Sequence, residues 1–199
     1  MKLTQVRSLI LLGASIPLAA FAQATFSLQN HDGFVGLDAP VYDWTGALLS
    51  GSNWRVELYG GTAPDSLSPA IGFRSNGRVI IPLWVPGYFS SIRSAQESDL
   101  IARGVPAAGW AWLQVRVWDV GLGSSYEEAV ARNLGGYGQS ALFYAQGGDP
   151  TAPPPTPPGP LIGLQSFSVL QITPEPSTWV LLGVGLGGLA GRLLRKRAS

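Results

Sequence analysis

The sequence predicts a mainly β protein: one antiparallel, β-sandwich-like domain, flanked by a cleaved signal peptide and a single C-terminal transmembrane helix. Two observations predict the domain. Segments 53–61 and 109–120 alternate apolar and polar residues with a period of two, as strands with one buried face do. Between such segments lie Gly, Pro and Asn-Gly, which punctuate antiparallel sheets. At both ends of the chain, an apolar stretch next to basic residues predicts the flanking segments.

Residues 1–22 have the three-part layout of a secretory signal peptide. Two basic residues precede a short apolar run, which closes on the small residues Ala20 and Ala22 of an A-x-A pattern. We expect the signal peptidase to cut after Ala22 and to leave Gln23 as the first residue. A permanent N-terminal anchor is the alternative, but the run is short and contains Pro17.

The β-rich domain is predicted to cover residues 23–148. In segment 53–61, Trp54, Val56 and Leu58 share one face of the strand, and the residues between them share the other. In segment 109–120 an aliphatic face lies opposite a face with several tryptophans. The other predicted strands are 24–30, 78–84 and 140–145.

One helix is predicted, over residues 125–133. Ser125 is a suitable N-cap, and Glu127 and Glu128 lie in the first turn, where negative charge is favourable. Because these two acids are adjacent on a helix, their side chains diverge. They do not form the facing pair that glycoside hydrolysis needs.

Residues 149–160 are rich in proline and are predicted to form an extended loop or a linker. Residues 161–172 then alternate once more, which predicts a final strand. A strand after the Pro-rich segment favours a loop that returns to the sheet over a stalk that leads to a membrane.

The composition excludes several kinds of chemistry. The chain has no cysteine, which excludes disulfides and thiol nucleophiles. Residues 23–174 contain seven arginines and no lysine against eleven acids, a net charge of −4 that argues against nucleic acid as a partner. His31 is the only histidine and reads as a polar turn residue, while Asp32, Asp38 and Asp43 read as solvated loop acids. We therefore expect no catalytic residue, no metal site and no cofactor.

Trp112 and Trp118 are the candidate glycan contacts. They lie on the face of segment 109–120 that is opposite its aliphatic face. If the aliphatic face is the core, these rings are exposed and can stack on the apolar faces of sugars. The alternative is that both faces are covered and the rings only pack.

The C-terminal segment 173–199 has the features of a membrane-anchored tail. A transmembrane helix is predicted at 178–194, with Trp179 at the membrane interface. Its apolar anchor residues are Trp179, Leu181, Leu182, Val184, Leu186 and Leu189. The basic residues Arg192, Arg195, Lys196 and Arg197 follow it and are expected on the cytoplasmic side.

Pro174-Glu175-Pro176, the apolar helix and the basic cluster occur in the order of the PEP-CTERM protein-sorting signal, which this segment resembles. The resemblance implies recognition of Pro174, Glu175 and Pro176 by an exosortase, a membrane transpeptidase that removes the tail, in a Gram-negative bacterium that makes exopolysaccharide. Residues 24–172 more loosely resemble uncharacterised surface proteins that carry the same signal, which implies no activity.

Together these features predict an exported, non-enzymatic protein. It is expected to be anchored transiently in the inner membrane, with its domain in the periplasm, and then released to the cell surface or the extracellular matrix. Its expected partners are the exosortase, the inner membrane and, as a candidate, exopolysaccharide. Three alternatives stay open: a carbohydrate-binding module, a hydrolase and an uncleaved membrane-anchored protein.

Overall fold

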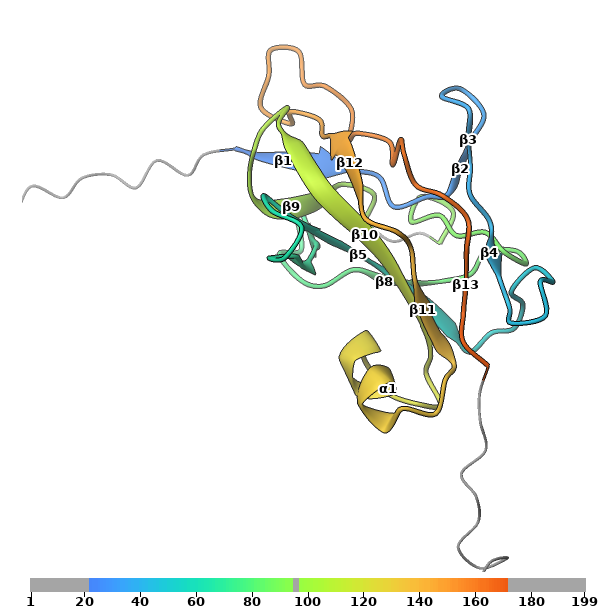
Figure 1. The fold of residues 1–199 in the computed structure, drawn as a ribbon. Helices are drawn as coiled ribbons and strands as arrows, with labels where there is room; N and C mark the ends of the chain where they lie inside the picture. Colours follow the sequence, from blue (N-terminus) through green and yellow to red (C-terminus); the bar gives the residue numbers. More distant parts are fainter. Residues whose placement is uncertain (1–21, 95–96, 172–199) are drawn as a thin grey trace, which may run out of the picture.

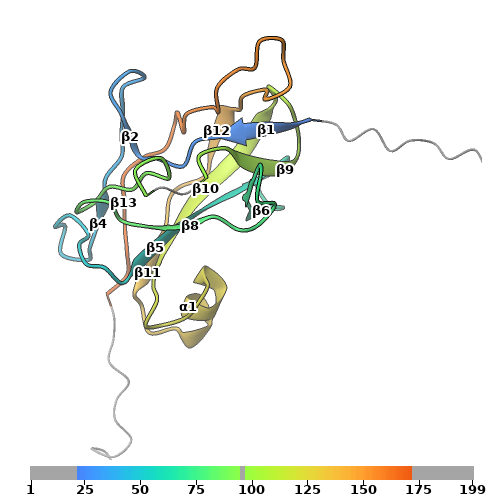
Figure 2. The same cartoon turned by 180° about the vertical axis from the view of Figure 1, so that it is seen from behind.

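The computed structural model describes residues 22–94 and 97–171. Within these ranges the chain is mainly β, with several antiparallel sheets and one short helix, α1. The predicted mainly β class is therefore confirmed. Figures 1 and 2 show that the described chain begins beside β1 and ends near α1, at the opposite end of the molecule.

The main sheet has six strands and is built on two long neighbours, β5 (Trp54–Gly61) and β10 (Trp110–Asp119). These two strands pair antiparallel, from Trp112 opposite Gly61 to Asp119 opposite Trp54. Both were predicted from their alternating pattern. The four shorter strands of this sheet are β6 (Ser68–Pro69), β8 (Ile80–Pro82), β11 (Tyr137–Gln139) and β12 (Phe143–Gln146).

β11 and β12 follow one another along the same edge of β10, with a bulge between them. Between the residues that pair with β10 in β11 and those that pair with it in β12, the β11–β12 segment contains one residue more than β10 does. Ser140 bridges this irregularity: its N–H donates to the Val115 carbonyl at 2.9 Å, and its hydroxyl accepts the Val115 N–H at 3.0 Å. The bulge lets the edge of β10 stay paired along most of its length.

The main sheet has an inner face, which packs on the hydrophobic core, and an outer face. A three-stranded sheet covers one end of the inner face. It consists of β1 (Gln23–Phe26), β9 (Leu100–Pro106) and β7 (Ile71–Gly72). The two sheets approach closely at β5, where a Cβ on Gly60 would lie 2.9 Å from the Cβ of Ala102. Loops and two-residue strands cover the rest of the inner face, so the finer description as a β-sandwich stays a prediction.

Two small strand pairs complete the β structure. β2 (His31–Asp32) and β3 (Leu37–Asp38) form a hairpin. β4 (Val41–Tyr42) pairs in parallel with β13 (Phe167–Ser168). β13 is the only part of the expected strand over 161–172 that is a strand among the described residues.

The Pro-rich segment starts and ends at the same residue of β1. The backbone N–H groups of Gly148 and Gly159 both donate to the Thr25 carbonyl at 2.8 Å. Beyond this point Leu161 and Leu164 are buried in the core. In the structure the segment is thus a loop, seen in orange in Figure 1, that leads the chain back into the domain.

Helix α1 (Tyr126–Arg132) forms where the sequence predicted it. The Ser125 hydroxyl accepts the N–H of Glu128 at 3.3 Å, which confirms the N-cap. Asn133 ends the helix with φ of 53°. The helix lies against the outer face of the main sheet, the face turned away from the three-stranded sheet, at the β11 end of β10 (Figure 1).

Two features of the longer strands were not predicted. β9 was missed, because Gly104, with φ of 78°, and Pro106 interrupt its alternation. The second face of β5 was expected to be solvated, yet Glu57 and Tyr59 on that face are buried. Their burial follows from the cover that α1 and Arg78 provide on this side of the sheet.

Candidate functional sites

The predicted processing and anchoring residues lie mostly outside the described part of the chain. This applies to residues 1–21 of the signal peptide, to Pro174, Glu175 and Pro176, to the predicted helix 178–194 and to the basic cluster. At the predicted signal peptidase site, the Ala22 carbonyl accepts the N–H of Ala107 at 2.9 Å, and Gln23 is the first residue of β1. No helix within residues 22–94 and 97–171 is long and apolar enough to cross a membrane.

Trp118 is not an exposed glycan contact, and that prediction was wrong. The residue is 0% exposed because α1 covers this end of the outer face. Its ring packs in a small cluster with Tyr126 and Ala129 of the helix, and its indole N–H donates to the Gly123 carbonyl at 3.1 Å. Trp118 therefore fastens the helix to the sheet.

Trp112 lies at the other end of β10 and is partly exposed, next to two rings that were not predicted as a site. Trp110 is 52% exposed and Tyr144 of β12 is 49% exposed. The Trp110 and Tyr144 rings are stacked, with centroids 5.3 Å apart and an interplanar angle of 21°. The Trp112 and Tyr144 ring centroids are 5.1 Å apart, and the two ring planes are tilted by 44°. The alternation of segment 140–145 could have placed Tyr144 outside, but not beside Trp110, because that depends on the register of two separate strands.

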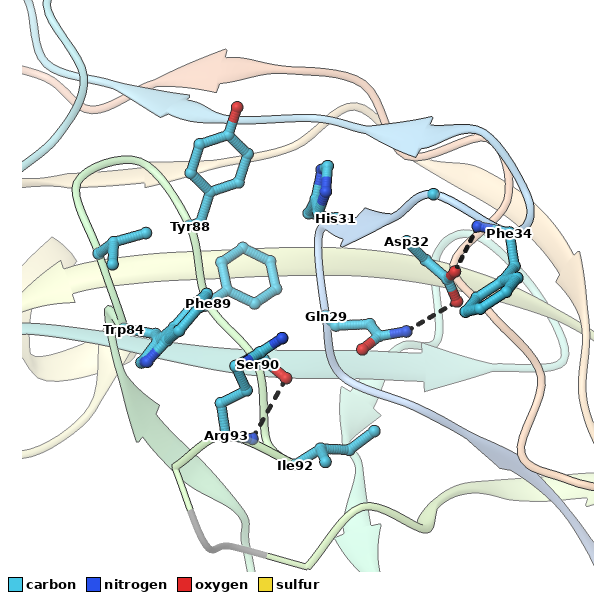
Figure 3. Close-up of a pocket in the computed structure, with 12 residues that line it drawn as sticks. Gln29, His31, Asp32, Phe34, Trp84, Tyr88, Phe89, Ser90, Ile92 and Arg93 are labelled. Atoms are coloured by element: carbon cyan, nitrogen blue, oxygen red, sulfur yellow. Dashed lines mark hydrogen bonds between the residues drawn. The ribbon is translucent and has the colours of Figure 1, made fainter.

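A second candidate site is a half-open pocket of about 650 Å³ near the β2–β3 hairpin, shown in Figure 3. Its size is in the range of ligand sites. Phe34 lies on one side, and Trp84 and Tyr88 lie on the other, with Gln29 between them. The Arg93 guanidinium lies 4.2 Å from the centre of the Trp84 ring and so occupies part of this aromatic surface.

His31 lines this pocket but is not joined to a nucleophile. Its Nδ1 lies 3.5 Å from an Asp38 carboxylate oxygen, and its ring makes a T-shaped contact with the Tyr88 ring, with centroids 5.7 Å apart. The nearby Ser90 hydroxyl accepts the Arg93 N–H at 3.4 Å. The observed contacts of His31 are those of a polar hairpin residue, with Asp38 shared by the Tyr88 hydroxyl at 3.1 Å.

The three loop carboxylates, Asp32, Asp38 and Asp43, have separate hydrogen-bond partners. Asp32 accepts from the Gln29 amide, and Asp43 accepts from the Thr45 N–H and hydroxyl, which lowers the pKa of Asp43. Within residues 22–94 and 97–171, no three acidic or histidine side chains are grouped as ligands for a metal ion.

A network of charged side chains joins the outer face of β5 to α1. The Arg78 guanidinium binds the buried Glu57 carboxylate through two nitrogens, with Nε at 2.6 Å from Oε1. The Tyr59 hydroxyl donates to Glu127 of the helix, and Arg116 lies 3.7 Å above the Tyr59 ring. Burial and the bond to Glu127 raise the pKa of Tyr59. The arginines neutralise both carboxylates, which suits a structural role.

Partial burial would raise the pKa of Glu127, but other contacts outweigh it. The hydrogen bond from Tyr59 and the nearby Arg78 and Arg116 together hold the pKa of this carboxyl below its usual value. Glu127 is therefore ionised at neutral pH. Glu128 points elsewhere, to the Ser124 N–H at 2.7 Å, so the two acids diverge as expected.

Residues 173–197 match the PEP-CTERM protein-sorting motif, so the chain carries this motif. The motif implies that an exosortase sorts an exported protein. No family model matches the N-terminal region, and no curated protein or solved structure matches the chain.

Proposed function

We propose that the protein is a surface or extracellular-matrix component that an exosortase releases from the inner membrane by cutting at or near Pro174-Glu175-Pro176. The single observation that supports this is the sorting motif at residues 173–197. In this proposal the domain stands in the periplasm while the predicted helix 178–194 holds the chain in the bilayer. The processed protein then resides among the exopolysaccharide of a biofilm.

Two features near the motif support cleavage by a membrane enzyme close to the folded domain. Proline restricts its own φ and disfavours the helical region for the residue before it, so we expect the two prolines to leave the motif extended and open to a membrane enzyme. The last described residues are already fixed to the domain, because the Leu170 N–H donates to the Tyr137 carbonyl at 2.8 Å. Only a few residues therefore separate the folded domain from Pro174.

We further propose that the domain is not an enzyme. The contacts of His31 with Asp38 and Tyr88 support this, since neither partner is a serine or threonine hydroxyl that the imidazole could activate. Purified protein should release no reducing ends from polysaccharide substrates. Release that disappears in the His31→Ala variant would overturn this part of the proposal.

The test of sorting is the intact mass of the protein from the culture supernatant and from the membrane fraction. We expect a soluble product that begins at Gln23 and ends near Pro176. The Pro174→Ala/Glu175→Ala chain should instead accumulate in the membrane at its uncut mass, with at least a tenfold loss of the soluble product. Pro155→Ala, the same kind of change in the exposed Pro-rich loop, is the matched control and should be processed normally.

A single membrane-bound species that ends at Ser199 in the unchanged protein would mean that the tail is only an anchor. Normal processing of the Pro174→Ala/Glu175→Ala chain would equally rule out this motif as the recognition element. Either result would end the exosortase proposal for this protein.

A further inference from the structure

The rings of Trp110, Trp112 and Tyr144 form an aromatic platform at one end of the outer face of the main sheet. Trp110 and Trp112 are two residues apart on β10 and so about 6.6 Å apart along the strand. Tyr144 of β12 pairs directly with Trp112. We infer that this platform is a binding site for an uncharged polysaccharide whose pyranose rings carry equatorial substituents, such as a β-linked glucan.

The geometry of the rings suits the faces of such sugars. Trp110 and Tyr144 are stacked on one another and each is about half exposed, so the stacked pair presents apolar ring surface to solvent. A pyranose with equatorial hydroxyls has two flat faces made of C–H groups. The electron-rich face of an aromatic ring attracts these polarised C–H groups, and stacking removes apolar surface from water on both partners.

Polar groups at the border of the platform match the hydroxyls at a sugar's edge. Gln146 pairs with Trp110 across the strands, and its amide nitrogen donates to the Ala108 carbonyl at 2.9 Å, which positions its side chain there. On the other side, Gly61 pairs with Trp112. A Cβ on Gly61 would lie 2.7 Å from the Ser66 carbonyl oxygen, so the turn after β5 forms a backbone rim at this edge.

The charge of the residues around the platform indicates whether a cationic, an anionic or an uncharged polysaccharide would bind there. Along the outer face, the strand residues next to the platform are neutral: Gln146, Gly61 and Gln114. The carboxylates of Glu57 and Glu127 lie farther along this face, and arginines pair with both. The described strand residues that border the platform thus offer no acid to a cationic polymer and no arginine to an anionic one. An uncharged chain fits this surface best.

The place of the platform in the fold leaves it accessible while the tail is held. The chain leaves the described domain at Leu170, which is bonded to Tyr137, the partner of Trp118 on β10. Eight residues separate Trp118 from Trp110, or about 26 Å of strand. Figure 1 shows the start of β10 near β1 and β12, far from the end of the described chain.

The test is affinity electrophoresis of the full chain in detergent, in gels with and without hydroxyethyl cellulose. We expect the unchanged protein to be retarded and the Trp110→Ala/Tyr144→Ala variant to lose at least tenfold in affinity. Trp44→Ala and Trp84→Ala are matched controls, since these indoles are 48% and 49% exposed elsewhere on the molecule. Both controls should bind like the unchanged protein. Equal far-ultraviolet circular dichroism and melting temperatures will show that the variants are folded.

Three results would overturn the inference. The first is no retardation by hydroxyethyl cellulose or by xylan. The second is retardation by the anionic polymer alginate only. The third is loss of binding in the Trp84→Ala control with normal binding in the platform variant, which would assign binding to the pocket. The inference does not rest on sorting, so the platform variant should still yield the processed mass.

Discussion

Single residues tie the helix to the sheet, and Glu127 is the most informative of them. Its carboxylate accepts from the Tyr59 hydroxyl and lies 3.4 Å from an Arg116 nitrogen. These contacts favour the ionised form and lower its pKa relative to that of the unfolded chain. A group with a lowered pKa stabilises the fold above its unfolded pKa and loses that contribution as the pH falls through its folded value.

Replacing Tyr59 by Phe should therefore change both stability and its pH dependence. We expect the free energy of unfolding at pH 7 to fall by about 1–2 kcal/mol, since a hydrogen bond to a charged group is lost. The deficit should shrink as the pH falls through the lowered pKa of Glu127, because the carboxyl then becomes protonated in both proteins. Chemical denaturation between pH 3 and 7 measures this. Tyr144→Phe, which changes an exposed tyrosine, is the control. A deficit that stays constant over this range would contradict the role assigned to Glu127.

The two sheets meet where a side chain is absent. Gly60 of β5 faces Ala102 of β9, and a Cβ at position 60 would lie 2.9 Å from the Ala102 Cβ and 3.0 Å from Leu113. Real Cβ atoms do not approach one another that closely in a packed core. The glycine is thus what allows the three-stranded sheet to approach the main sheet.

Gly60→Ala should destabilise the protein by about 1–3 kcal/mol through overpacking. Part of this loss should be recovered in the Gly60→Ala/Ala102→Gly double variant, because the second change removes the methyl group that clashes. Thermal and chemical unfolding of the four proteins in this cycle measures the coupling. Gly33→Ala is the control, since nothing lies within 4 Å of its added Cβ. Strictly additive effects of the two changes would show that the close approach does not limit packing.

At the scale of the whole molecule, the domain is closed by its last segment. Leu161, Leu164 and Val169 are buried in the same core as β5 and β10. They reach it because the Pro-rich loop returns the chain to Thr25. The folded unit therefore extends to the edge of the sorting segment, and the loop is an excursion within it.

A chain cut after Pro160 should lose a large part of its stability. It loses three buried apolar side chains, each worth about 1.5–3 kcal/mol, against a total stability of about 5–15 kcal/mol. A chain cut after Ile172 keeps them and should melt at the same temperature as the full chain. Circular dichroism and limited proteolysis of the two truncated chains compare these outcomes. A stable domain in the shorter chain would mean that the Pro-rich segment is a stalk.

The sequence alone predicted the features that depend on neighbouring residues. β5 and β10 follow from the alternation around Trp54 and Leu113, and α1 follows from Ser125 as its N-cap. The sorting motif at 173–197 is also a local pattern, and its match is independent of the fold. These features could be predicted because strand alternation, capping and recognition motifs are each written within a few consecutive residues.

Only the tertiary structure decided which aromatic rings are exposed. Trp112 and Trp118 are equivalent in the alternation of β10, yet α1 buries Trp118, and Trp112 lies beside Tyr144. The aromatic platform forms only because β12 pairs with β10. The Pro-rich loop returns to the domain through backbone hydrogen bonds to Thr25. These contacts join segments far apart in the chain. Their free energy depends on the packing of the whole domain, which no short stretch of sequence encodes.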